Sequence, residues 1–448
     1  MRSKVKDSLA NVAGNVYRRR WFVWIVACLA QTLGLFHRAS MSPMADRIMG
    51  DFGVSATALG GLAAAYFYIY SAMQLPSGTL ADTLGPRKTI TMGLLLSAAG
   101  ALVMSQAPSF SLVYAGRIIM SFGASVVWLS IIKLLMAWFR TGELGTMTGL
   151  SSAVGNSGQI IAATPLAVLI TSIGWRMSIL SVSLVTFGLA IAGWLIIRDS
   201  PAQAGLAGVA GYDAGGVLEA GRPAHQPGLG KRLRAVVTNR GLWPLFFIHF
   251  GMYGAYSTFF HNWAVVYLMQ TYGVTRDAAA NLPLVAAVGQ IIGAPLLGFL
   301  VDRVWHRLRL PTVISAGVAL AGFLVLSTWH GGSLPFEALY PACFFIGLSM
   351  GAVPLVFVSA NALSPPGVRG TATGLVNTGG FIGAAMAQPL FGYLLDRNWE
   401  GVIIGGVRFY PAAGFQQGLW LCAGLAAVGL IGALLSRETF RRALPDHG

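Results

Sequence analysis

The chain has 448 residues, of which 55% are hydrophobic and only 10% are charged. Soluble globular proteins carry roughly 25% charged residues, so this composition argues against a soluble protein and indicates a polytopic membrane protein. The formal net charge of +15 would suit nucleic acid, but the basic residues gather on one side of the predicted membrane, as the positive-inside rule requires.

Apolar runs near 20 residues recur along the chain, and each is long enough to cross a hydrocarbon core of ~30 Å. The first run begins at Trp21 and is too long for the core of a signal peptide, so no cleavable signal is expected. The distribution of Lys and Arg predicts that both termini are cytoplasmic. The predicted membrane spans cover residues 21–44, 57–78, 88–107, 110–137, 145–172, 176–197, 243–270, 279–301, 311–329, 337–360, 368–395 and 413–436.

The longest polar segment covers residues 198–242. It is rich in Gly, Ala and Pro and ends in basic residues, which predicts a flexible cytoplasmic linker with a short amphipathic stretch over 229–240. The linker divides the chain into a cytoplasmic segment 1–20, a six-helix bundle 21–197, a second six-helix bundle 243–436 and a cytoplasmic tail 437–448.

The two predicted bundles repeat one another in sequence. The stretch "GTLADTLGPRK" (78–88) aligns with "GFLVDRVWHRLR" (298–309), and "LGTMTGLSSAVGNSG" (144–158) aligns with "RGTATGLVNTGGFIG" (369–383). Two parallel repeats of six helices are typical of transporters whose halves rock around a site near the middle of the membrane.

The stretch 78–88 resembles the loop between the second and third helices of the major facilitator superfamily, and "GRIIMSFGAS" (116–125) resembles its fourth-helix motif. The resemblance covers essentially the whole chain outside the linker. It implies an all-α membrane protein with 12 transmembrane helices in two six-helix bundles, the major facilitator fold. Gly85 allows a tight turn, and Asp82 can accept hydrogen bonds from Arg87 or Lys88. The residues expected to gate the cytoplasmic side are Gly78, Asp82, Gly85, Arg87, Lys88, Arg117, Asp302 and Arg303, with a mainly structural role for Arg117.

Cys28, Cys343 and Cys422 all lie in apolar runs, without a CxxC or Cys/His spacing. Neither a disulfide nor a metal site is therefore expected. The sequence also lacks a nucleophile–base pair and a Gly-rich phosphate loop, so we expect no cofactor and no enzymatic activity.

An ionisable residue inside a membrane span is a candidate for a functional site, because burying it is costly. The spans contain His37, Arg38, Arg117, Lys133, His249 and His261. On the first helix, Gln31, Gly34, Arg38 and Ser42 follow helical spacing and form one polar face. This face directs Arg38 into the bundle, although a long side chain at this height could instead reach the outer interface.

The first helix resembles that of the anion-transporting branch of the superfamily, which includes organophosphate and sugar-acid carriers and has a basic residue at the position of Arg38. Lys133, five residues before Trp138, resembles a second basic position of that branch. Ser257 stands where phosphate-ester carriers have another arginine, so a clamp for a doubly charged phosphate is not expected.

The acid that couples protons on the fourth helix of sugar-acid carriers is missing here, since Ala124 lies near its place. His37 and His261 are therefore the candidate proton sites, because histidine titrates near neutral pH. Aromatic and amide side chains at helical spacing complete the expected cavity. The predicted substrate-binding residues are Arg38, Tyr66, Tyr70, Gln74, Lys133, Asn156, Gln159, Tyr253, Ser257, His261, Asn377 and Gln388.

Together these features predict a secondary active transporter that works by alternating access. The expected activity is proton-coupled symport of a small organic anion, a carboxylate or a zwitterion, with Arg38 as the anchor. A drug or metabolite exporter, an organophosphate-type exchanger and a non-transporting sensor remain alternatives. The expected partners are a small-molecule substrate, protons and the lipid bilayer, without nucleic acid. We expect a monomer in a bacterial inner membrane.

Overall fold

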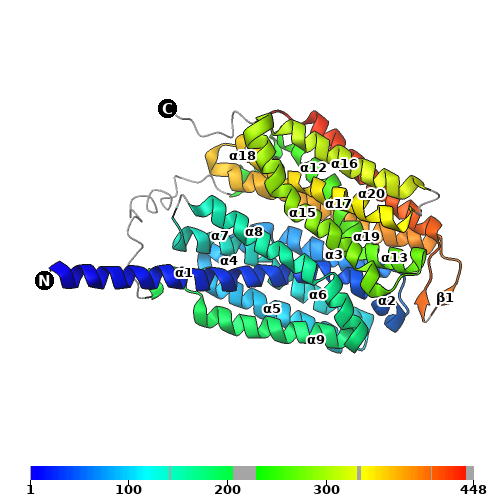
Figure 1. Cartoon of the computed structure of the whole chain (residues 1–448), viewed down its shortest axis with the longest axis horizontal. Coiled ribbons are helices and arrows are strands. Elements are labelled where there is room, and N and C mark those ends of the chain that lie inside the picture. Colours follow the sequence, from blue (N-terminus) through cyan, green and yellow to red (C-terminus); the bar gives the residue numbers. More distant parts are fainter. Residues whose placement is uncertain (1, 141–142, 205–228, 330–333, 405, 440–448) are drawn as a thin grey trace.

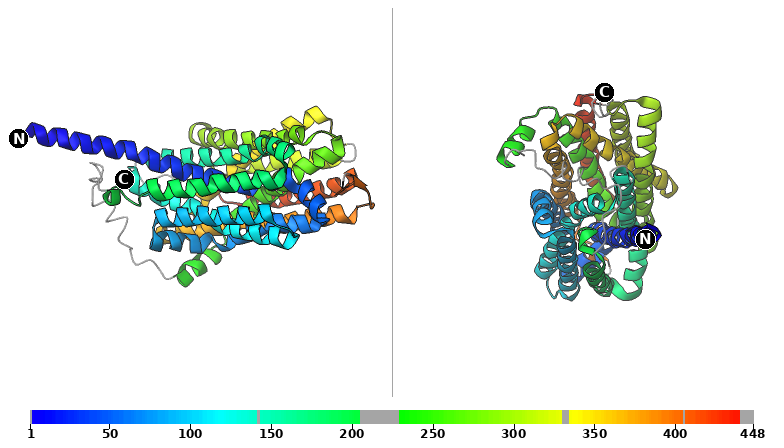
Figure 2. Two further views of the ribbon diagram at one scale, coloured as in Figure 1. Left: turned by 90° about the horizontal axis from the view of Figure 1, so that it is seen from below. Right: turned by 90° about the vertical axis from the view of Figure 1, so that its left-hand side faces the viewer.

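The computed structural model describes residues 2–140, 143–204, 229–329, 334–404 and 406–439. Its helices run roughly parallel to one long axis (Figure 1). Helix α1 (Arg2–Ala39) projects from one end of the bundle, here called the terminal end. A short hairpin of β1 (Ile403–Ile404) and β2 (Val407–Arg408) lies at the opposite, distal end (Figures 1 and 2).

The first half of the chain forms one set of helices. Its elements after α1 are α2 (Met41–Phe52), α3 (Ala56–Ala72), α4 (Gln74–Leu84), α5 (Pro86–Gln106), α6 (Phe110–Ser125), α7 (Val127–Trp138), α8 (Leu144–Ile161) and α9 (Thr164–Ile196). Several predicted spans are built from two helices, because the helical path breaks at Ser40, Met73 and Val126.

The linker contributes η2 (Ala202–Ala204) and α11 (Leu229–Val237), and α11 occupies most of the predicted amphipathic stretch. Residues 205–228 of the predicted linker lie outside the described residues. The second half comprises α12 (Leu242–Thr258), η3 (Phe259–Trp263), α13 (Ala264–Tyr272), α14 (Arg276–Ala279), α15 (Asn281–Leu300), η4 (Val301–Trp305), α16 (Arg309–Thr328), α17 (Phe336–Ser349), η6 (Met350–Ala352), α18 (Val353–Ala362), η7 (Pro366–Val368), α19 (Arg369–Arg397) and α20 (Ala412–Leu435).

Within the described residues, eight helical stretches are long and apolar enough to cross a membrane. One of them, Thr146–Ile196, contains two predicted spans, which Gly174 separates with a left-handed φ of 78°. The predicted spans at 57–78, 243–270 and 368–395 are helical but fall outside these eight stretches. The first two are interrupted at Met73 and by the π-helix η3, while the third is a continuous helix with many Gly, Thr and amide residues.

Close helix packing rests on small residues, as expected for membrane helices. A Cβ at Gly158 of α8 would lie 2.0 Å from the carbonyl oxygen of Thr32 on α1, so the two backbones are in contact there. In the second half, a Cβ at Gly383 of α19 would lie 2.3 Å from the carbonyl oxygen of Phe250 on α12. Gly149 and Gly374 have no such neighbour, so close packing covers only part of each glycine-rich face.

The two halves meet mainly where α3 packs against α19 (Figure 1). Among the described residues, the hydrogen bonds between the halves run from the middle of the bundle to its distal end. The structure is therefore closed at the distal end.

Candidate functional site

Arg38 lies inside the bundle near the end of α1, and only 9% of it is exposed. Its guanidinium carbon is 5.7 Å from the centroid of the Tyr253 ring, which belongs to α12 in the other half. Its Nε has no hydrogen-bond partner within the described residues, and no acidic side chain there lies within 4 Å of it. The arginine is thus a buried cation faced by aromatic rings and not by a carboxylate.

The aromatic cluster around Arg38 consists of Tyr66, Phe67, Tyr70, Tyr253 and Phe381. Tyr66 and Tyr70 of α3 stack with centroids 5.9 Å apart, and Tyr70 lies 4.6 Å from Phe381 of α19. Phe381 in turn contacts Tyr253 edge to face at 5.6 Å. The cluster therefore joins both halves beside Arg38, and its hydroxyl groups and ring faces offer both polar and apolar contacts to a ligand.

Arg117 of α6 supports Arg38 through the backbone. Its Nη1 donates to the carbonyl oxygen of His37 at 2.6 Å, and its Nη2 to that of Arg38 at 3.4 Å. These carbonyls belong to the last turn of α1, where a helix lacks intrahelical donors and favours a cation. The guanidinium also lies over the ring of Tyr66 at 5.0 Å. This geometry fits a structural role for Arg117.

The ring of His37 is fully enclosed, and neither ring nitrogen has a partner within the described residues. The ring belongs to the residue whose carbonyl binds Arg117. A second positive charge here would be buried, unpaired and near a cation, which is costly. Of the two predicted proton sites, His37 is therefore the less suited by geometry.

His261 links the two halves through hydrogen bonds. Its Nε2 lies 2.9 Å from Oε1 of Gln159 on α8, and its Nδ1 lies 3.0 Å from Oγ of Ser257 one turn earlier. The amide nitrogen of Gln159 donates to Asn156 at 2.8 Å and approaches Gln290 at 3.5 Å. Because this fixes the Gln159 oxygen toward the imidazole, His261 Nε2 is the donor and neutral Nδ1 accepts from Ser257.

His261 sits in the π-helix η3, a break in the seventh predicted span. One-turn π-helical segments are frequent at functional sites because they move side chains out of the regular α-helical register. Sequence analysis identified His261, Ser257 and Tyr253 at helical spacing, but it did not predict this π-helical turn or the role of Phe67 in the aromatic cluster.

Four other predicted site residues are not among the contacts described for Arg38. The side chain of Gln388 is fully buried, with neither amide atom partnered within the described residues, two turns beyond Phe381 on α19. Gln74 begins α4 just after the break at Met73, and Asn377 is half-buried on α19. Lys133 is half-buried on α7. The contacts described for Arg38 include none of these four side chains.

The predicted gating loop is only partly described. Gly85 has the left-handed φ of 82° expected of a tight turn, and Pro86 follows at the start of α5. Arg87 donates to the carbonyl oxygen of Trp194 at 2.8 and 3.0 Å and lies over its ring, so it binds α9 within the same half. Lys88 and Arg303 are exposed. The side chains of Asp82 and Asp302, and the surroundings of Gly78, lie outside the described set.

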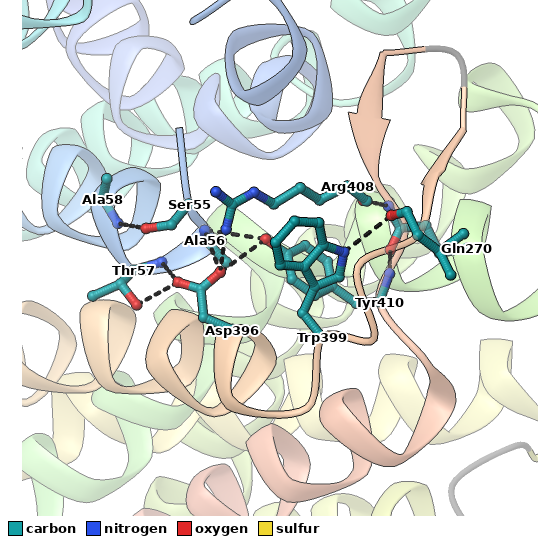
Figure 3. Close-up of polar contacts among 10 residues, drawn as sticks. Ser55, Ala56, Thr57, Ala58, Gln270, Asp396, Trp399, Arg408 and Tyr410 are labelled. Atoms are coloured by element: carbon teal, nitrogen blue, oxygen red, sulfur yellow. Dashed lines mark hydrogen bonds and ion pairs between the residues drawn. The ribbon is translucent and has the colours of Figure 1, made fainter. Parts of the chain in front are cut away.

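Two polar links between the halves at the distal end were not predicted. Arg276 on α14 pairs with Asp46 on α2 through its two terminal guanidinium nitrogens, Nη1 and Nη2, and both side chains are buried. Asp396, in the last turn of α19, binds the first residues of α3 (Figure 3). Sequence analysis could not identify these links, because no local pattern pairs residues hundreds of positions apart.

Two sets of apolar helices of membrane-spanning length that meet around a buried arginine are typical of a membrane transporter. The chain belongs to the Major Facilitator Superfamily, whose sequence profile matches residues 27–388. Like its relatives, it is an integral membrane transporter and not an enzyme, and the relatives described below are bacterial. The predicted major facilitator fold is thereby confirmed.

The chain is 25% identical over 403 residues to the probable sulfoacetate transporter SauU of Cupriavidus necator, covering 85% of this chain and 88% of that protein. It is 26% identical to the glycerol-3-phosphate transporter of Bacillus subtilis, covering 79% and 81%. Both relatives belong to the predicted anion-transporting branch. The structure resembles a bacterial homologue of the human lysosomal transporter Spinster in an inward-facing, unoccupied conformation. Its TM-score is 0.70 at 17% identity, over 96% of this chain and 99% of that chain.

Proposed function

We propose that this protein is a proton-coupled symporter of a small organic anion or zwitterion, whose carboxylate binds Arg38. The observation that carries the proposal is the burial of Arg38 among aromatic rings, without an acid within 4 Å in the described part of the chain. A buried unpaired cation is costly, so an anionic ligand at this point gains both charge neutralisation and charge-assisted hydrogen bonds.

The number of arginines available to the ligand indicates how many negative charges the site can bind. The site offers one guanidinium to the ligand, because Arg117 is engaged with the end of α1 and Ser257 is engaged with His261. One guanidinium matches one carboxylate better than a dianionic phosphate ester. The similar proteins named for sulfoacetate and glycerol-3-phosphate support an anionic cargo in general.

His261 is the proposed proton site. It contacts the other half through Gln159, so a proton on Nδ1 would reverse the hydrogen bond with Ser257 and add a positive charge at the interface. Substrate charge, proton and the contact between the halves are then linked, as symport requires. We further propose that Lys133, Asn377, Gln74 and Gln388 contact substrate in other states of the cycle.

The orientation of the cycle follows from the basic loops. By the positive-inside rule, we propose that the terminal end, with the start of α1 and the end of α20, faces the cytoplasm. The structure then represents a state closed toward the outside, and the monomer is the proposed transporting unit.

The test is uptake into proteoliposomes that contain the purified protein. Radiolabelled small carboxylates, phosphate esters, sugars and cationic drugs are compared, each with and without an imposed pH gradient. The proposal predicts saturable uptake of a carboxylate that a proton gradient stimulates. Counterflow of phosphate esters alone would indicate an exchanger. Outward pumping of cationic compounds would indicate an exporter, and either result would contradict the proposal.

A further inference from the structure

Asp396 occupies an unusual place for a carboxylate. It lies in the last turn of α19 in the second half, and its side chain reaches the first residues of α3 in the first half (Figure 3). Oδ1 accepts from the backbone N–H of Ala56 at 3.0 Å. Oδ2 accepts from the backbone N–H of Thr57 at 2.8 Å and from its hydroxyl at 2.5 Å.

These contacts complete the N-terminal cap of α3. The first N–H groups of an α-helix have no partner within the helix. Ser55 at the N-cap satisfies only Ala58, at 3.2 Å. Asp396 satisfies Ala56 and Thr57 and places a negative charge at the positive end of the helix dipole. The acid thus does for α3 what a capping side chain normally does within one helix, but from the opposite half.

The hairpin after α19 holds the carboxylate in place. The Tyr410 hydroxyl donates to Oδ1 at 3.1 Å and accepts from Ala56, and Arg408 lies 3.4 Å from the same oxygen. Gln270 of α13 fixes the hairpin by donating to the Arg408 carbonyl and accepting from the Tyr410 N–H. Both carboxylate oxygens therefore have donors, and only 18% of the side chain is exposed.

Backbone contact between α3 and α19 brings the cap together. A Cβ at Gly392 would lie 2.2 Å from the carbonyl oxygen of Ala56, and one at Gly60 would lie 2.4 Å from that of Gln388. With glycine at both positions the helices touch without intervening side chains. Separation of the halves at this end must therefore break the bonds of Asp396 to α3.

We infer that Asp396 is a positioning residue for the transport cycle, whose carboxylate caps α3 across the interface and holds the distal end closed. We call the contacts of Asp396 with Ala56 and Thr57 the distal cap. The inference rests on the proposed transport cycle only in taking the halves to separate at this end. Its test reads conformation and needs no substrate.

The test measures distances across the distal end in the full chain, purified in detergent. Spin labels are placed at Ser109→Cys and Glu337→Cys, two exposed positions at the starts of α6 and α17 in opposite halves. The three native cysteines are buried, so they compete little for the label. Pulsed electron spin resonance then gives the populations of short and long distances.

Asp396→Ala is expected to raise the population of the long distance about tenfold, because the Thr57 N–H loses its acceptor and the Ala56 N–H keeps only the Tyr410 hydroxyl. The matched control is Asp277→Asn. Asp277 is also an acid at this end that bonds the other half, but through one exposed contact with Thr171 at 3.2 Å. It should leave the distances unchanged. Equal behaviour of the two variants would overturn the inference.

A double-mutant cycle separates the cap from general damage. Thr57→Ala should shift the population in the same direction as Asp396→Ala but less, and should add nothing when Asp396 is already alanine. If Asp396→Ala does not fold, Asp396→Asn and Thr57→Ala carry the test, since asparagine keeps the volume of Asp396 and Thr57→Ala leaves the carboxylate in place. Additive effects in the cycle would contradict the cap. Failure of the parent protein to transport any carboxylate, while Asp396→Ala still shifts the distances, would count against the proposed function and not against the cap.

Discussion

The imidazole Nε2 of His261 and the side-chain oxygen of Gln159 lie 2.9 Å apart and join the two halves of the transporter near its centre. The contact crosses 102 positions of sequence and ends in a histidine, the side chain whose charge most readily changes near neutral pH. In the proposed cycle the halves separate here, so protonation of His261 would be coupled to their movement.

His261→Gln should abolish stimulation of uptake by a pH gradient while substrate exchange without a gradient continues. Glutamine can still bond Gln159 but does not titrate. Uptake is measured in proteoliposomes with and without an imposed gradient. His249→Gln is the matched control, because His249 is also buried but bonds a backbone carbonyl of its own half, at 3.1 Å. Persistent stimulation in His261→Gln would exclude this residue as the proton site.

Arg38→Lys should retain weak transport, whereas Arg38→Ala should lower uptake by about 10- to 100-fold through loss of charge-assisted hydrogen bonds. Lysine keeps the charge but not the planar fork. Initial rates at subsaturating substrate report the effect. Arg437→Ala, which removes an exposed charge beyond α20, should transport normally. Unchanged uptake in Arg38→Ala would exclude Arg38 as the residue that binds the anionic group of the substrate.

Tyr253→Phe should bind substrate nearly as well as the parent protein, and Tyr253→Leu should bind about 3- to 30-fold more weakly. The ring lies 5.7 Å from the Arg38 guanidinium and orients it, a cation–π contact that phenylalanine keeps and leucine loses. Ligand-dependent thermal shifts of the purified variants give the affinities. A larger loss in the phenylalanine variant would instead assign the function to the hydroxyl group.

The distal cap should be insensitive to pH across the range of about pH 5 to 8. Burial by itself raises the pKa of Asp396, but hydrogen bonds from Thr57, Ala56 and Tyr410 outweigh it and hold the pKa below its ordinary value of 3.8. Because the pKa of Asp396 is lowered in the closed state, the cap stabilises that state fully when the pH is above the ordinary pKa of the carboxyl group. This stabilisation is lost as the pH falls through the lowered pKa of the closed state.

The spin-label distances described above test this pH dependence. Arg408 and Tyr410 also face the carboxylate, and burial together with the Asp396 charge raises the pKa of Tyr410, so its hydroxyl stays protonated across this range. The population of the long distance should stay constant from about pH 8 to 5 and rise only in stronger acid. A rise near neutral pH would show that another group controls the distal end.

The sequence predicted the features that depend on local pattern. Hydropathy predicted apolar helices, the repeat predicted two halves, and Gly85 and Pro86 predicted the turn found before α5. Arg38 was identified because a cation in an apolar helix is costly wherever the helix packs. These signals are carried by neighbouring residues or by one helical face.

The features that escaped prediction depend on contacts between distant segments. In the sequence, Phe67 cannot be distinguished from the other apolar residues of α3. Only its ring contacts with Phe381 and Tyr253 show that it belongs to the aromatic cluster. Asp396 lies 339 positions from Thr57, and its position at a helix end gave no sign of a cap on another helix. The π-helical turn at His261 also has no sequence signature of its own.

The most direct test of the central claim is equilibrium binding of a carboxylate ligand and of its neutral amide analogue to the purified protein. The parent protein and Arg437→Ala should prefer the acid to the amide by about tenfold or more, because only the acid pairs with Arg38. Arg38→Ala should bind both weakly and equally. An Arg38→Ala protein that still prefers the acid would contradict the assignment of Arg38 as the anion anchor.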